Sequence, residues 1–192
     1  SDVTFNNTKA KCGTYFAIMH CIGTPAEVTT LNVTGGEIAC KSPGVLIKST
    51  NVDINFDDVK MASESGILVK SIMSVDPNAE EAANTKGQDV YGIHATFKDM
   101  DVAGDIVHED KDNRSMTVYL VSTTLNGAVK DAYITVDKDS KWTATGNSNV
   151  IIVGSVDVSQ IDAPKGVTIN AVAGESGTYT LAGGGTLILK AS

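Results

Sequence analysis

Carboxylate side chains gather in three short segments, and such clusters suit a hard cation. Calcium binds several oxygen atoms from carboxylates, amides and carbonyls, so acids on neighbouring turns are candidate ligands. None of the segments has the Asp-x-Asp-x-Asp-Gly pattern of an EF-hand loop, and the alternative for each is a solvated acidic turn. We expect calcium, where it binds, to be held by residues of the first two segments: Asp99, Asp101, Asp105, Glu109, Asp110 and Asp112.

Trp142, the only tryptophan, follows the third acidic segment, Asp137-Lys-Asp139. An exposed indole would give a sugar ring an apolar face to stack on. With that role, the predicted ligand-binding residues are Trp142, Asp137 and Asp139. The alternative is a core side chain, which the polar flanks Lys141 and Thr143 favour, because neighbours in a strand point to opposite faces.

The three cysteines, Cys12, Cys21 and Cys40, have no metal-ligand spacing and cannot all pair with one another. Cys12 and Cys40 are one repeat apart, so they fall at equivalent places in adjacent rungs. Rungs stacked about 4.8 Å apart bring two such residues within reach of a disulfide. Buried free thiols that pack as small apolar groups are the alternative.

Short alternating apolar runs separated by polar turns recur along the chain, and they must position these side chains. Val52 to Phe56, Ile93 to Phe97 and Met116 to Leu120 are the clearest examples, and no helical period is present. A unit of short strands that recurs about every 20 to 30 residues is typical of a β-solenoid. Low aromatic content, 5%, agrees, because medium-sized aliphatic side chains stack well in columns.

We therefore predict one all-β domain over residues 1–192, a single-stranded right-handed parallel β-helix of roughly seven rungs. The polar stretch 74–89 breaks the period and is expected to be a loop insertion, either a tolerated surface loop or a lid over a binding face. Residues 176–192 are expected to form a capping hairpin. The side chains expected in the core are Val52, Ile54, Phe56, Ile67, Val69, Phe97, Val118, Leu120, Ile134 and Val136.

Charge and hydropathy exclude two classes of partner. The formal net charge is −8 and Arg114 is the only arginine, whereas nucleic-acid-binding proteins need clustered Lys and Arg. No stretch approaches the roughly 18 apolar residues of a membrane span. The chain opens on a strand-like segment, Ser1 to Phe5, so we expect a mature or truncated product.

Several segments between residues 90 and 172 carry a resemblance to a known group of proteins. Gly104-Asp105-Ile106, Leu125-Asn-Gly-Ala128 and Trp142-Thr-Ala-Thr-Gly-Asn-Ser148 resemble elements of secreted adhesin-like right-handed β-helices and autotransporter passenger domains. These belong to the pectin-lyase-like superfamily, and the chain is also similar to clostridial secreted β-helical carbohydrate-binding proteins. The resemblance implies a secreted or cell-surface bacterial protein that binds a polysaccharide or host glycan, acidic polysaccharides and calcium included.

Catalysis is not expected, although polysaccharide lyases and hydrolases share this fold. Lyases of the fold use an arginine base near bound calcium, and hydrolases use several aspartates with Gly-His-Gly and Arg-x-Lys segments. Here one arginine is followed by Ser115 and Met116, and His20, His94 and His108 lack glycine neighbours. We expect an adhesin-like, glycan-binding protein without catalytic residues. The alternatives are a structural stalk or passenger segment and, less favoured, a lyase-like enzyme; the sequence leaves the oligomeric state open.

Overall fold

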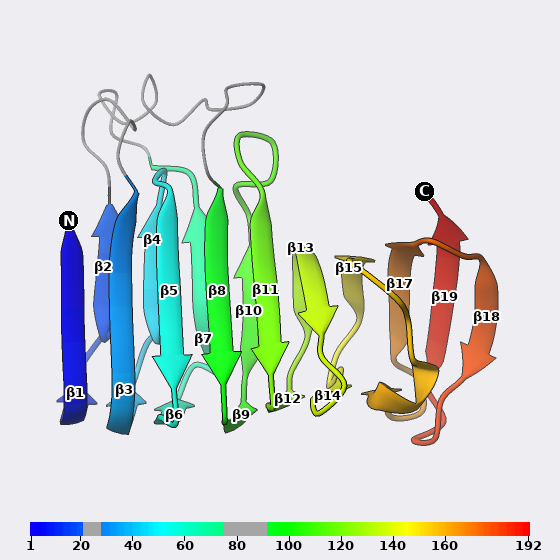
Figure 1. The fold of residues 1–192 in the computed structure, drawn as a ribbon, viewed down its shortest axis with the longest axis horizontal. Coiled ribbons are helices and arrows are strands. Elements are labelled where there is room, and N and C mark those ends of the chain that lie inside the picture. The colour runs from blue at the N-terminus through cyan, green and yellow to red at the C-terminus, as the bar shows by residue number, and fades with distance from the viewer. Residues whose placement is uncertain (21–27, 75–91) are drawn as a thin grey trace.

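A computed structural model describes residues 1–20, 28–74 and 92–192 of the chain (Figure 1). The fold is all-β, and among these residues the only helical segment is one 3₁₀ turn, η1 (Val158–Gln160). None of the helical structure in this part of the chain is long and apolar enough to cross a membrane.

A curled, largely parallel sheet winds into a solenoid-like coil. In Figure 1 one row of strands runs along the near side and a second row runs in the opposite direction behind it. The two rows join through β13, which pairs with β10 at Val129 and Lys130 and with β11 from Tyr133 to Val136. The near row consists of β1 (Asp2–Cys12), β3 (Thr29–Cys40), β5 (Val52–Asp57), β8 (Ile93–Lys98), β11 (Met116–Val121) and β13 (Val129–Val136).

The remaining strands complete each turn of the coil. The far row consists of β2 (Ala17–His20), β4 (Val45–Lys48), β7 (Ile67–Ile72) and β10 (Asp105–His108). A narrow third side is formed by β6 (Lys60–Ser63), β9 (Asp101–Ala103), β12 (Thr124–Asn126), β14 (Lys141–Thr143) and β16 (Ile161–Asp162). The last turns contain β15 (Ser148–Ile152), β17 (Thr168–Ala173), β18 (Gly177–Thr180) and β19 (Thr186–Ala191).

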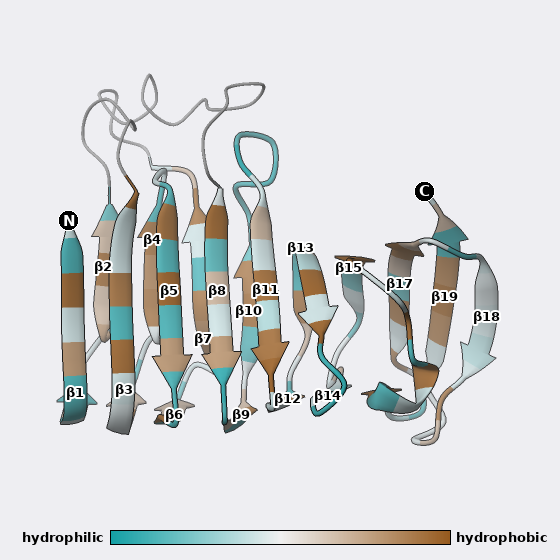
Figure 2. Ribbon diagram, viewed as in Figure 1, coloured by the Kyte–Doolittle hydropathy of each residue, from teal (hydrophilic) through white to brown (hydrophobic). Residues whose placement is uncertain are grey.

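Period-two alternation explains how the near row holds the core. In β5, β8 and β11 every second side chain is buried and the others are outside, and Figure 2 shows the alternating colours along β5 and β8. Because the strands pair in register, the buried side chains stack into columns. Phe56 lies beside Phe97, with ring centroids 5.6 Å apart, and Leu120 follows Phe97 in the same column.

At the corner after the near row the backbone passes through the left-handed region. Asn7, Gly35, Asp58, Asp99 and Ser122 have φ between 47° and 64°. Short polar residues and glycine tolerate this conformation better than other residues, so the polar turns of the sequence lie here. The backbone N–H of Asp58 donates to the carbonyl of Lys98, which ties one corner to the next turn.

The predicted core is confirmed with two exceptions. Eight of the ten expected side chains are buried, but Ile67 and Val136 are partly exposed. An irregular register between β7 and β10 leaves Leu68 and Val69 buried in place of Ile67. Val136 pairs with Leu120, whereas the register with β15 ends at Ile134, so the next turn leaves Val136 uncovered.

The chain ends in the predicted hairpin, since β18 pairs antiparallel with β19. Strand β19 also pairs in parallel with β17, so it belongs to both the coil and the hairpin. The predicted loop insertion 74–89 lies outside the described residues apart from Ser74, which is buried.

Candidate ligand-binding face

Trp142 lies in the core and cannot be a stacking platform. It is 0% exposed, it pairs in register with Leu125, and its Nε1–H donates to the carbonyl oxygen of Gly127 at 2.9 Å. A sugar needs an open ring face to stack on, and this ring has none. The prediction that Trp142 contacts a ligand is therefore wrong, and the core interpretation holds.

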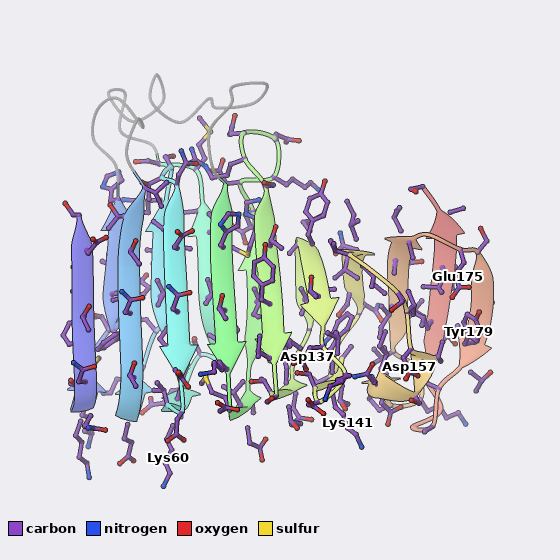
Figure 3. All side chains as sticks on the ribbon, viewed as in Figure 1. Lys60, Asp137, Lys141, Asp157, Glu175 and Tyr179 are labelled. Atoms are coloured by element: carbon purple, nitrogen blue, oxygen red, sulfur yellow. The ribbon has the colours of Figure 1, made fainter. Side chains whose placement is uncertain are left out.

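Asp137 organises the turn between β13 and β14. Its carboxylate accepts hydrogen bonds from Ser140 Oγ at 2.6 Å, from the backbone N–H of Ser122 at 3.2 Å and from that of Asp139 at 3.1 Å. Partial burial would raise the pKa of Asp137, but these hydrogen bonds outweigh it and lower the pKa below its usual value. The carboxylate of Asp139 pairs with the neighbouring Lys138 at 2.6 Å. Figure 3 shows Asp137 and Lys141 near this end of the turn.

The six predicted calcium ligands are spread over different surroundings. Asp99 is a corner residue, Asp101 is exposed on β9, and Asp105 accepts a hydrogen bond from the backbone N–H of Ala128 at 2.8 Å. No three acidic, histidine or cysteine side chains among the described residues form a group that fits a metal ion.

The second acidic segment is divided in the same way. Glu109 forms an ion pair with Lys70 at 2.9 Å, Asp112 is exposed, and Asp110 is buried. The structure thus adds nothing in favour of calcium, which stays a prediction.

Asp110 instead anchors a buried polar cluster at the end of the far row. Arg114 Nε donates to Asp110 Oδ2 at 2.6 Å, and both side chains are 0% exposed. Arg114 Nη1 also donates to Asn51 Oδ1 at 3.2 Å, and its carbonyl lies 2.9 Å from His108 Nε2. Burial lowers the pKa of His108 below its usual value.

This cluster is enclosed, so it supports the fold and offers no surface to a large ligand. The Oγ of Ser71 and the Nδ1 of His108 are buried and have no hydrogen-bond partner in the described parts of the chain. The two residues are register partners on β7 and β10. Arg114 is the only arginine in the sequence. Its position four residues after Asp110 is the signal that indicates a pair.

The exposed side of the near row carries a different set of side chains. We call this surface the front face and define it as the outward side chains of β5, β8, β11 and the part of β13 that pairs with β11, Tyr133 to Val136. Because the four strands are in register, the side chains form adjacent columns on one sheet. The set comprises Asp53, Asn55, Asp57, His94, Thr96, Lys98, Thr117, Tyr119, Val121, Tyr133 and Thr135.

Acidic and basic side chains on the β5–β8 half of the front face are paired with one another. His94 Nδ1 lies 3.0 Å from Asp53 Oδ1, and Lys98 Nζ lies 2.8 Å from Asp57 Oδ2. The hydrogen bond that Lys98 donates to Asp57, together with the negative charge of Asp57, raises the pKa of Lys98. The β5–β8 half of the face therefore presents acid–base pairs instead of a patch of one sign.

The β11–β13 half is aromatic and uncharged. Tyr133 is 38% exposed, and the partly exposed Tyr119 is its diagonal neighbour on the adjacent strand. The Tyr119 ring meets His94 edge to face, with centroids 6.1 Å apart. Ile151, the register partner of Tyr133, and Val153, 46% exposed, continue the apolar surface. Thr117 and Thr135 are the register partners of Tyr133 and Tyr119.

The sequence contains the signal for this face. Tyr119 lies between the core residues Val118 and Leu120, and Tyr133 lies between Ala132 and Ile134. Alternation in a strand assigns both tyrosines to the outside once their neighbours are assigned to the core.

Three comparisons with known proteins found no relative of the chain. No protein-family model matches the chain, and neither the curated proteins nor the solved structures contain a significant match.

Proposed function

We propose that the chain binds a neutral polysaccharide on the front face without transforming it, as part of a secreted or cell-surface bacterial protein. The observation that carries the proposal is the pair of outward tyrosines, Tyr119 and Tyr133, on adjacent strands of the front face, with Thr135 and Thr117 as their register partners. Tyrosine suits such a surface because it offers an apolar ring for stacking and a polar hydroxyl group that can stay hydrated.

Strand spacing supports an extended glycan that crosses the strands. Neighbouring strands are about 4.8 Å apart, close to the length of one pyranose unit, so equivalent side chains repeat at nearly the spacing of sugar rings. A chain laid from β13 towards β5 would meet Tyr133 and Tyr119 first and then the hydroxyl and amide groups of Thr96 and Asn55.

Electrostatics favour a neutral glycan over an acidic one. The protein has a net charge of −8, which repels a polyuronate, and the one lysine of the front face, Lys98, is already paired with Asp57. An acidic polysaccharide would need bridging cations, which is why the binding assay includes calcium.

We also propose that the coil is a right-handed parallel β-helix of roughly seven rungs. In support, the near strands descend and the far strands ascend while the chain advances from N- to C-terminus along the coil in Figure 1. The series of parallel pairs from β1 to β19 supports a rung number of this order.

Depletion assays on insoluble polysaccharides and affinity electrophoresis on soluble ones test the function, each with calcium and with chelator. We expect binding to a neutral β-linked glycan, about tenfold weaker in Tyr133→Ala or Tyr119→Ala and nearly unchanged in Tyr133→Phe. Tyr15→Ala is the matched control, because Tyr15 is also partly exposed but precedes β2 on another side of the coil.

The same assays separate the alternatives. Failure to bind any glycan would favour the stalk or passenger segment. Release of reducing ends or unsaturated uronides would favour the enzyme. Binding that all three alanine variants retain would place the ligand elsewhere on the coil.

A further inference from the structure

Two cysteines lie side by side where the first two turns of the coil meet. Cys12 ends β1 and Cys40 ends β3, and they are register partners in the parallel pairing of these strands. Cys40 is buried at 3% exposure, whereas Cys12 is partly exposed and packs against the same core. Both are free thiols in the structure.

The backbone at this point suits a covalent link. Neighbouring strands lie about 4.8 Å apart, which falls inside the Cα separations found for disulfides, about 4.4 to 6.8 Å. The pairing also continues past the cysteines, because the N–H of Lys41 donates to the carbonyl of Cys12 at 3.3 Å. No strand shift is needed to bring the two residues together.

We propose that Cys12 and Cys40 are a redox pair that forms a disulfide and links the first turn of the coil to the second. The oxidant is a low-molecular-weight disulfide. This inference is independent of glycan binding, since neither cysteine belongs to the front face.

The reaction proceeds by two thiol–disulfide exchanges. The more exposed Cys12 thiolate attacks the small disulfide, which forms a mixed disulfide at Cys12 and releases one small thiolate. The Cys40 thiolate then attacks the Cys12 sulfur and releases the second small thiolate. The two protons lost by the cysteines are taken up by the released thiolates, so the small disulfide is reduced to two thiols.

Burial makes the second exchange the slow one. Removal from water, with the nearby Cys12 sulfur, raises the pKa of the Cys40 thiol to about 11. Only the thiolate attacks, so ring closure should speed up as the pH rises from 7 to 9. Because Cys40 is buried and Cys12 is more exposed, the mixed disulfide at Cys12 should form before the cross-link.

The experiment uses the full chain with Cys21→Ser, because Cys21 lies outside the described residues and would complicate the assignment. The folded protein is treated with oxidised glutathione at pH 7, 8 and 9 and quenched with acid. Digestion with trypsin and a Glu-specific protease then separates Cys12 from Cys40, because the sequence has Glu27 and Glu37 between them. Mass spectrometry follows the mixed disulfide and the cross-linked peptides.

We expect the 12–27 and 38–41 peptides to be joined, with a loss of two hydrogens, and a Tm about 5–10 °C above that of the reduced protein. Dithiothreitol should reverse both changes. The added variants Cys12→Ser and Cys40→Ser, each with Cys21→Ser, should show no oxidation-dependent change in Tm. Persistent glutathione adducts without the cross-link, or thiols that react only after denaturation, would overturn the proposal.

Discussion

Loss of a single ring from the stacked phenylalanine column tests how the coil is held together. Phe97 is 0% exposed and stacks on Phe56 of the preceding turn, with ring planes 24° apart and centroids 5.6 Å apart. Phe97→Ala removes the ring and leaves a cavity between two turns. We expect this to lower the free energy of unfolding by about 3–5 kcal/mol, and Phe56→Ala by a similar amount.

A double-mutant cycle isolates the contact between the rings. The losses in unfolding free energy of the two single variants should add up to about 0.5–1.5 kcal/mol more than the loss in the double variant. This difference is the usual contribution of an aromatic pair beyond the area that it buries. Equilibrium denaturation followed by circular dichroism gives all four free energies. Thr96→Ala, an outward change on the same strand, is the control and should stay within about 0.5 kcal/mol of wild type. A loss below about 1 kcal/mol for Phe97→Ala, or strict additivity of the pair, would refute the stacked column.

Three further outcomes follow from the buried polar groups. Arg114→Ala leaves the Asp110 carboxylate buried without its cationic partner, so denaturation should show a loss of about 3–5 kcal/mol, whereas Lys111→Ala, which removes an exposed pair, should change stability little. Equal losses would contradict the burial of the pair. Because burial lowers the pKa of His108 in the folded state, the unfolded chain takes up this proton first as pH falls below about 6.5. Tm should then fall more steeply from pH 6.5 to 5 in wild type than in His108→Gln, and parallel curves would remove His108 as a cause. Trp142→Phe leaves a backbone carbonyl unpaired and should cost about 1–3 kcal/mol in denaturation while glycan binding stays intact; weaker binding at equal folding would restore the tryptophan to the site.

Local alternation is enough to predict most of the strands and the core. Val118 and Leu120 are assigned to the inside from a run of six residues, and the structure agrees. Alternation does not predict the partial exposure of Ile67 and Val136, because that exposure depends on the neighbouring turn. An irregular register displaces Ile67, and a register that ends early uncovers Val136. Such effects arise between turns far apart in sequence, and alternation within one strand does not contain them.

The candidate site was harder to predict because clusters of polar residues in a sequence do not show which groups are already engaged. Asp110 counts as a calcium ligand in the sequence, but Arg114 occupies its carboxylate in the fold. Asp137 counts as a ligand-binding acid, but its oxygens hold a turn. Tyr119 and Tyr133 were predictable from the buried neighbours that flank them, since their positions follow from alternation alone.

The most direct test of the central claim is the affinity of wild type and Tyr133→Ala for the best-bound neutral polysaccharide, measured by depletion at equal folded fraction. The account predicts measurable wild-type binding that weakens about tenfold in Tyr133→Ala and survives in Tyr15→Ala. Equal affinity of wild type and Tyr133→Ala would contradict the front face as the binding surface.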